Sequence, residues 1–249
     1  PPTITVIFGT CAQATAVTIL APSLAMPPAS ASRPAMKIIG EVTLNLLSTH
    51  SQRLMPSIHN LLGEASLKVH DLQGIALSLG PGSFTGLRIG ISFIKGFTFM
   101  RPVSVVPVSS LESMALAWHP ASSRPLVTTF DARREEVFWA RFRSVEGRIV
   151  RETPDALVPA TAFADALNDE DIVITDTLGY ARSTVYGVLA KRPDVFSIES
   201  TPVLRGLSCA RRAAQAKSEE WIAPGGLVPR YLSEGYIKPA ASAPTETGQ

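Results

Sequence analysis

Short runs of apolar and β-branched residues alternate along the chain with longer stretches in which apolar residues recur at helical spacing. Runs of the first kind, bounded by glycine or polar residues, are typical of β-strands. In the first half, the predicted strands are residues 3–8, 14–20, 37–47, 72–79 and 103–108. A polar turn at 9–13 separates the first two strands, which therefore form a hairpin.

Residues 51–65 and 84–99 predict two long helices. In the first, Leu54, Ile58 and Leu62 fall on one apolar stripe. Pro56 lies inside it and is expected to bend the helix or loosen its first turn.

The second helix, 84–99, is apolar almost all round, with Arg88 and Lys95 as its only charged residues. A helix without a polar face is buried or shared with a partner. Two interpretations stay open: a core helix against its own sheet, or a helix with one face on the sheet and the other on a second subunit. Gly86 and Gly90 lie one turn apart, which would let another backbone approach closely.

The opening pattern returns in the second half, where two apolar runs, 126–130 and 137–142, flank the polar turn 131–135. This repeat indicates an internal duplication with one hairpin opening each half. Further elements are predicted at 109–118 (helix), 160–167 (helix), 172–175 (strand), 181–190 (helix) and 204–217 (helix). We expect one lobe over 1–108 with a mobile, Pro-rich loop at 22–34, a second over 109–238, and a disordered tail at 239–249.

Composition excludes several classes of protein. Of 249 residues, 45% are hydrophobic and 18% charged, which is typical of a globular protein. The net charge of +2 is too small to indicate broad electrostatic binding of nucleic acid. Cys11 and Cys209 have no disulfide or zinc spacing, which fits a reducing compartment. With no membrane span and no signal peptide predicted, we expect a cytoplasmic protein.

The most informative segment is Leu-Gly-Pro-Gly-Ser-Phe-Thr-Gly-Leu-Arg-Ile-Gly at 79–90. It predicts a strand, a sharp glycine-proline turn and a helix start, where Ser83 or Thr85 could cap the helix. Exposed N–H groups at a helix start can hold an anion. The segment lacks the lysine of a phosphate-binding P-loop and the spacing of a dinucleotide fingerprint.

The same segment, taken with four others, resembles the signature of the TsaB family, which belongs to the actin-like ATPase superfamily. The other matching segments are 50–56, 108–112, 130–138 and 229–232. They occur in the family's order, and the similarity covers about residues 3–238.

The resemblance implies an α/β fold of two actin-like (ribonuclease H-like) lobes, each a mixed sheet flanked by helices. It also implies a partner subunit without catalytic activity in N6-threonylcarbamoyladenosine synthesis on tRNA. The paralogue TsaD carries the metal and the transferase site, TsaE joins the pathway, and contact with tRNA is indirect. The chain would have no cofactor of its own, with ATP or ADP held at the interface with its partner.

In the family the two subunits join through the two helices that follow the first sheet, here 51–65 and 84–99. The residues expected at the partner interface are His50, Arg53, Leu54, Ile58, Leu62, Leu87, Ile91 and Ile94. Ser83 and Arg88 are expected near a nucleotide where the subunits meet.

The residues themselves also argue against catalysis. Actin-like ATPases hold magnesium through carboxylates at the ends of their hairpin strands. Gly9 stands where the family usually has an aspartate, and Asp131 in the second hairpin lies beside Arg133 and Arg134. We therefore expect neither catalytic residues nor metal ligands.

Two further candidates, a metal site formed by histidines and a serine nucleophile, are not supported by their spacing. His50 and His59 are nine residues apart, on opposite sides of a straight helix. The spacing around Ser83 differs by one residue from a hydrolase elbow.

Three alternatives stay open. An active actin-like ATPase or kinase would need a further carboxylate, such as Glu41 or Asp176, and relatives in the superfamily have been classed as peptidases. The two helices could instead pair two copies of this chain as a homodimer. Arg205, Arg211 and Arg212 lie on or near one predicted helix and could contact tRNA, although a solvated helix face is the simpler interpretation.

Overall fold

The computed structural model describes residues 4–11, 14–22, 36–45, 50–100, 103–118, 124–146, 148–176, 184–200 and 205–232. The expected disordered tail lies outside the described residues. So does the expected loop at 22–34, except for Pro22, which ends a strand.

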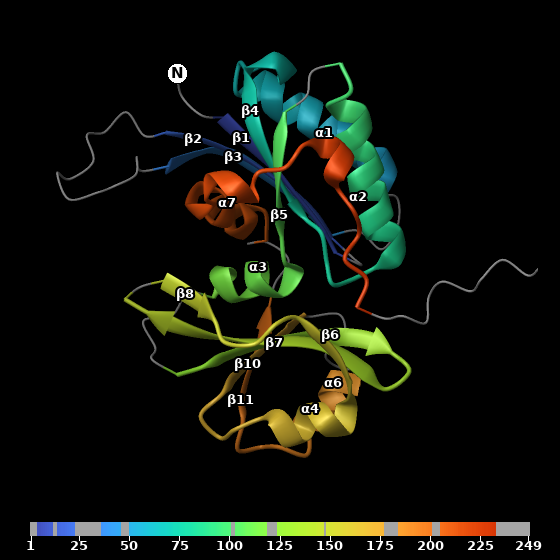
Figure 1. The fold of residues 1–249 in the computed structure, drawn as a ribbon, viewed down its shortest axis with the longest axis vertical. Coiled ribbons are helices and arrows are strands. Elements are labelled where there is room, and N and C mark those ends of the chain that lie inside the picture. The colour runs from blue at the N-terminus through green and yellow to red at the C-terminus, as the bar shows by residue number, and fades with distance from the viewer. Residues whose placement is uncertain are drawn as a thin grey trace, which may run out of the picture.

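The first sheet has five strands in the order β3-β2-β1-β4-β5. They are β1 (Ile4–Cys11), β2 (Ala14–Pro22), β3 (Met36–Asn45), β4 (Leu72–Ser78) and β5 (Ser104–Val108). The pairs β3–β2 and β2–β1 are antiparallel, whereas β1–β4 and β4–β5 are parallel. Helices α1 (His50–Glu64) and α2 (Phe84–Phe97) cover one face of this sheet (Figure 1).

The second sheet repeats the arrangement of the first. It contains β6 (Leu126–Arg133), β7 (Glu136–Val145), β8 (Arg148–Arg151), β10 (Ile172–Asp176) and β11 (Phe196–Ser200). Taken from β8, the order β8-β7-β6-β10-β11 has two antiparallel pairs followed by two parallel pairs, as in the first sheet. This confirms the internal duplication predicted from the two hairpins and the fold class of two α/β lobes.

The elements around the second sheet are shorter. Strand β9 (Ala156–Pro159) pairs with β7, and helices α4 (Ala160–Ala166) and α6 (Thr184–Leu189) pack together over the sheet. By their place in the repeat, α4 corresponds to α1 and α6 to α2. Strands β8, β9 and β11 were not predicted from the sequence.

The last helix of each half packs on the other half. Helix α3 (Ser110–Ala117) follows the first sheet but places Leu111, Met114 and Ala115 in the core of the second. Helix α7 (Arg205–Gln215) follows the second sheet but packs on the first, where its Cys209 and Ala210 are buried in a shared apolar cluster. Helix α7 thus covers the face of the first sheet opposite α1 and α2 (Figure 1).

The expected second lobe, 109–238, is therefore wrong for its last part. From α7 to residue 232 the chain returns to the first lobe through the short 3-10 turns η3 (Ser218–Glu220) and η4 (Pro224–Gly226). Residues 227–232, which we call the C-terminal segment, run beside the start of α2. Leu227 is 2% exposed in the first core, and the Arg230 N–H donates to the Leu79 carbonyl at 3.3 Å.

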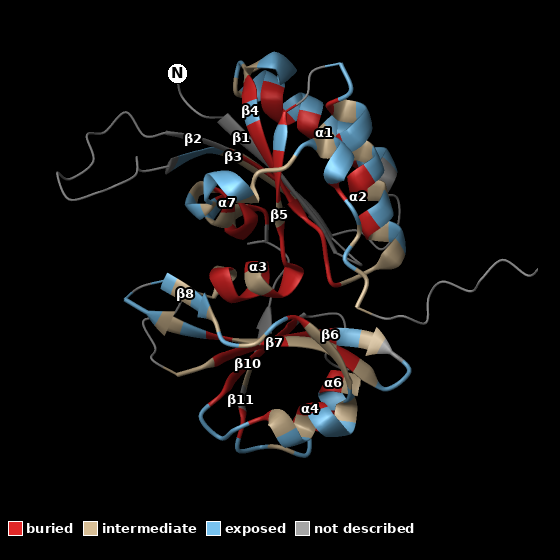
Figure 2. Cartoon of the chain, viewed as in Figure 1, coloured by how far each residue is buried: buried red, intermediate tan, exposed pale blue. Residues whose placement is uncertain are grey.

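Ion pairs and hydrogen bonds tie the two lobes together around α3. Glu112 on α3 accepts a hydrogen bond from Arg212 on α7 at 2.9 Å and pairs with Arg151 on β8 at 3.5 Å. Arg151 also binds the buried Asp155 at 2.5 Å, and Asp155 lies 3.5 Å from Arg230 of the C-terminal segment. The junction between the lobes is consequently polar at its rim, whereas α3 itself is largely buried (Figure 2).

Glu220 supplies a pH-dependent part of this junction. Burial disfavours its charged form, but hydrogen bonds from the Arg212 side chain and the Lys217 backbone outweigh that effect and lower the pKa of its carboxyl. A carboxyl whose pKa is lowered by folding stabilises the fold above its unfolded pKa of about 4.3 and loses that effect as pH falls through the folded value.

We therefore expect Glu220→Gln to reduce the free energy of unfolding at pH 6 and to matter less at pH 3. Urea titrations of both proteins across this range provide the measurement. A difference between them that stays constant or grows on acidification would contradict the assignment.

Candidate functional site

Helix α1 divides into a buried stripe and an exposed outer side. Leu54 and Ile58 are each 1% exposed and Leu62 is 4% exposed, packed in the first core. The exposed residues of the helix are Gln52, Arg53, Met55, Pro56, His59, Asn60, Gly63 and Glu64. Pro56 thus sits on the solvent side of the helix.

Helix α2 is divided in the same way, so the expectation of a helix without a polar face is wrong. Leu87, Ile91 and Ile94 are 2%, 6% and 0% exposed. The exposed residues are Thr85, Arg88, Ser92, Lys95 and Gly96, and Ile89 is half-buried among them. Figure 2 shows the contrast between the buried sides of α1 and α2 and their outer sides.

The residues expected at a partner interface are therefore corrected. The structure buries all six apolar ones in the core of their own lobe, because the stripe of each helix is needed to cover the sheet. Those residues are Leu54, Ile58, Leu62, Leu87, Ile91 and Ile94. Arg53 is exposed, and its place at a partner interface stays a prediction. His50 begins α1, but its side chain lies outside the described residues.

The outer side of the two helices, which we call the outer face, carries mainly positive charge. Arg53, Arg88 and Lys95 are exposed there, against the single carboxylate of Glu64. The middle of α2 contributes small side chains instead: Thr85, Ser92 and Gly96, with Ile89 among them, follow each other at spacings of three and four residues. Such a row lies along one line of a helix and leaves room for a second helix to approach.

The glycine turn before α2 is held firmly. Gly80 has φ of +105°, and a Cβ there would lie 3.0 Å from the Leu87 side chain and 3.2 Å from the Arg230 carbonyl oxygen. Its own carbonyl accepts from the Ser110 N–H at 2.9 Å. Only glycine therefore fits this position without strain.

Ser83 is the N-cap of α2. Its hydroxyl accepts a hydrogen bond from the Gly86 N–H at 3.3 Å, which satisfies one of the free N–H groups of the first turn. This geometry gives Ser83 a structural role. Whether a nucleotide lies near Ser83 and Arg88 stays a prediction.

Arg88 is held on two sides at the edge of the outer face. Its guanidinium carbon lies 4.0 Å from the centre of the Phe84 ring, and its Nε donates to the Tyr231 hydroxyl at 3.1 Å. The Phe84 and Tyr231 rings stack at 4.9 Å. The contact between Arg88 and Tyr231 could not be predicted, because the two residues are far apart in the sequence. The contact between Arg88 and Phe84 could have been predicted from their four-residue spacing on a helix.

The carboxylate of the second hairpin has a structural partner. Asp131 Oδ2 accepts from the Thr184 N–H at 3.1 Å, at the start of α6. Of the further carboxylates considered, Glu41 is half-buried in β3 of the other lobe, and the Asp176 side chain lies outside the described residues. Among the described residues, no group of three or more His, Cys, Asp or Glu side chains could hold a metal ion.

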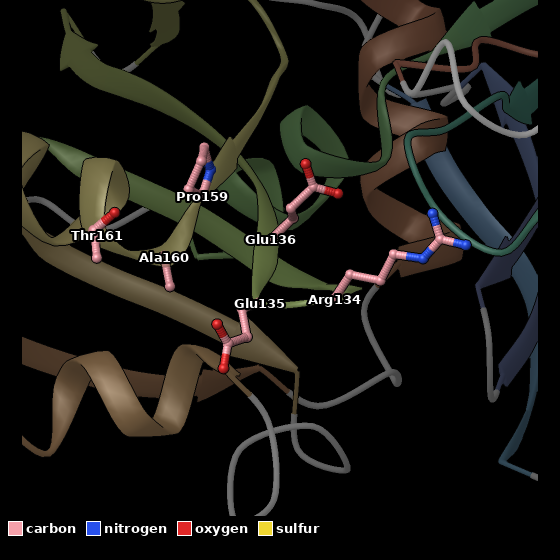
Figure 3. Close-up of a pocket in the computed structure, with 6 residues that line it drawn as sticks. All are labelled: Arg134, Glu135, Glu136, Pro159, Ala160 and Thr161. Atoms are coloured by element: carbon pink, nitrogen blue, oxygen red, sulfur yellow. The ribbon is translucent and has the colours of Figure 1, made fainter.

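An open hollow of about 430 Å³ lies beside the same hairpin. Its lining residues are Arg134, Glu135, Glu136, Pro159, Ala160 and Thr161. The side chains of Arg134, Glu135 and Glu136 point in different directions (Figure 3), so their charged groups do not converge on one point. The hollow offers no recognisable arrangement of acid, base and nucleophile.

Of the two arginines of α7 whose side chains the structure describes, one is ion-paired and the other is exposed. Arg212 is paired with Glu112 and Glu220, while Arg211 is exposed. The Arg205 side chain lies outside the described residues. In the same described part, no helix is long and apolar enough to cross a membrane.

Comparison with known proteins places the chain among tRNA-modification proteins. The family described as TsaD, tRNA N6-adenosine threonylcarbamoyltransferase, matches residues 37–216. The tRNA threonylcarbamoyladenosine biosynthesis protein TsaB of Bacillus subtilis is 28% identical over 195 residues, which cover 78% of this chain and 84% of that protein. The Escherichia coli protein of the same name is 35% identical over 101 residues, covering 40% of this chain and 44% of its own length.

Solved structures show the same fold. YeaZ from Pseudomonas aeruginosa superposes with a TM-score of 0.66 at 22% identity, covering 92% of this chain and all of that one. A second Pseudomonas aeruginosa structure, of an uncharacterized protein with similarity to peptidase YeaZ, gives a TM-score of 0.69 at 22% identity and covers 93% of this chain and 100% of that one.

The division of α1 into two sides can be tested with neighbouring residues. We expect Ile58→Ala to lower the free energy of unfolding by roughly 2–5 kcal/mol, because it leaves a cavity in the core. His59→Ala, on the exposed side of the same helix, should change it by less than about 0.5 kcal/mol. Chemical denaturation measures both, and similar values for the two variants would contradict the assigned faces.

Proposed function

The chain belongs to the family described as TsaD, tRNA N6-adenosine threonylcarbamoyltransferase, and within it to the TsaB (YeaZ) proteins, and from this membership we propose that it is a partner subunit without catalytic activity. In this proposal it binds a TsaD subunit through the outer face of α1 and α2, during synthesis of threonylcarbamoyladenosine on tRNA.

The proposal rests on a difference in helix length between the two duplicated halves. Helices α1 and α2 have 15 and 14 residues, whereas their counterparts α4 and α6 have 7 and 6. At 1.5 Å per residue, the first pair is about 20 Å long and the second about 10 Å. The longer pair packs on a sheet of five strands and the shorter pair on a sheet of six, so we infer that the added turns of α1 and α2 serve a further purpose.

The outer face has the form of a helix-packing surface. The small residues Thr85, Ser92 and Gly96 of the outer row leave room for another helix to approach, and the buried stripes behind the row hold both helices in place. A second pair of helices laid across α1 and α2 would make a four-helix packing. The buried apolar residues then support the interface from below, and the side chains in contact are those of the outer row together with Arg53.

The absence of catalytic activity is the second part of the proposal. Gly9 in β1 has no side chain to hold magnesium, and Asp131, the carboxylate of the other hairpin, accepts a hydrogen bond from the start of α6. We expect metal, nucleotide and transfer chemistry to belong to TsaD, with TsaE as a further partner and ATP or ADP at the interface. The complex would assemble in the cytoplasm, where the sequence predicts the chain to lie.

A charge placed in the middle of the outer row tests the proposed face. Ser92→Glu adds a larger, charged side chain to an exposed position and should weaken TsaD binding by at least about tenfold, while the thermal unfolding temperature changes little. Ala162→Glu, exposed on α4 of the second lobe, is the matched control and should bind as the unchanged chain does. Titration calorimetry with purified TsaD gives the affinities.

The functional consequence follows in a reconstituted tRNA-modification assay. Threonylcarbamoyladenosine formation should depend on this chain and fall with Ser92→Glu, but not with Ala162→Glu. Magnesium-dependent ATP hydrolysis by the pure chain, lost on Asp131→Asn, would contradict the proposal and support an active ATPase instead.

A further inference from the structure

The guanidinium of Arg88 is held in place but not neutralised. The Phe84 ring covers one of its faces and the Tyr231 hydroxyl accepts from its Nε. Within the described residues, no carboxylate lies within ion-pair distance of Arg88, although the side chain is exposed. Its two terminal nitrogens have no hydrogen-bond partner among those residues, so four N–H groups stay available in a planar fork.

This arrangement differs from that of the other cations on the outer face. The side chain of a surface arginine or lysine is usually mobile, and ordering it on binding costs rotamer entropy. For Arg88 much of that cost is already met by the contacts with Phe84 and Tyr231. A planar guanidinium in a fixed position is suited to bidentate recognition of a planar oxyanion.

The surroundings favour a negative group. The first turn of α2 contains no acidic residue, and the positive end of the helix dipole lies there. Arg53 and Lys95 are further exposed cations of the same two helices, against Glu64 alone. A partner that covers this face should therefore present acidic side chains to it.

We propose that Arg88 is the specificity-determining anchor of the outer face and receives a carboxylate side chain of the partner subunit through its terminal nitrogens. Tyr231 acts as a positioning residue that orients the guanidinium. The inference rests on the proposed function, because it names the chemistry by which the same face recognises its partner.

The arginine fork itself is tested by Arg88→Lys, which keeps the charge but loses the planar pair of donors. We expect it to weaken TsaD binding by about 30-fold, the effect of losing an interface hot spot. Lys95→Ala and Arg53→Ala remove exposed charges from the same helices and should each weaken binding by less than about fivefold. Circular dichroism on heating checks that every variant is folded.

The acceptor is found by a double-mutant cycle. Aspartates and glutamates on the docking surface of TsaD are changed singly to Asn or Gln and titrated against the unchanged chain and Arg88→Ala. One such change should weaken binding to the unchanged chain but should not weaken binding to Arg88→Ala any further. Tyr231→Phe should weaken binding about threefold to tenfold in the unchanged chain and leave it unaffected in Arg88→Ala, a pattern that a general structural defect would not produce.

The outcomes separate this inference from the proposed function. If TsaD does not bind the unchanged chain, or Ser92→Glu binds normally, the proposed face is wrong, and the role assigned to Arg88 is then wrong as well. If Ser92→Glu fails to bind but Arg88→Lys binds normally, only the anchor is wrong. If the Arg88→Lys defect appears solely when ADP is added, the fork receives a phosphate, which overturns the carboxylate assignment.

Discussion

The structure depends on the exchange of terminal helices between its two halves. Each sheet must be covered on both faces, and in the described part of the chain each half places two helices on one face of its own sheet before the chain crosses over. Helix α3 completes the second lobe and α7 completes the first. With α7 on the inner face of the first sheet, α1 and α2 are confined to the opposite face, where their apolar stripes are buried and their other sides meet solvent (Figure 1).

The same exchange accounts for the C-terminal segment. Once α7 lies on the first sheet, the chain continues past β5 to the start of α2, where Leu227 enters the core and Tyr231 meets Arg88 and Phe84. Arg230, one residue earlier, faces the buried Asp155 of the second lobe. Six residues thus connect the outer face, the glycine turn and the junction between the lobes.

Much of this could be predicted from the sequence, and the errors have physical causes. The strands of both hairpins and the two long helices follow from runs and periodicity, and the repeated hairpin revealed the duplication. Strands β8 and β9 have four residues each, and β8 consists of two apolar residues between two arginines, too short a pattern to distinguish from a loop. The position of α7 depends on contacts between distant parts of the chain, which no local pattern encodes.

The interface residues show the limit most clearly. In α2 the residues at 87, 91 and 94 are more apolar than those at 85, 89, 92 and 96, but this difference alone does not decide which side faces the sheet and which faces a partner. We expected the most apolar residues of the two helices to lie at the partner interface. That expectation wrongly placed there the residues that pack in the core of their own lobe. The outer row consists of three small residues and one isoleucine beside an arginine, a composition typical of many exposed helices and therefore a weak signal in a single sequence.

In the proposed complex, the outer face of α1 and α2 is the surface that meets the partner. A photoreactive benzoylphenylalanine placed at position 92 on α2, or at position 162 on α4, shows which of the two helices TsaD contacts. After irradiation with purified TsaD, we expect a covalent heterodimer from position 92 and none from position 162. Capture of TsaD from position 162 but not from position 92 would contradict it.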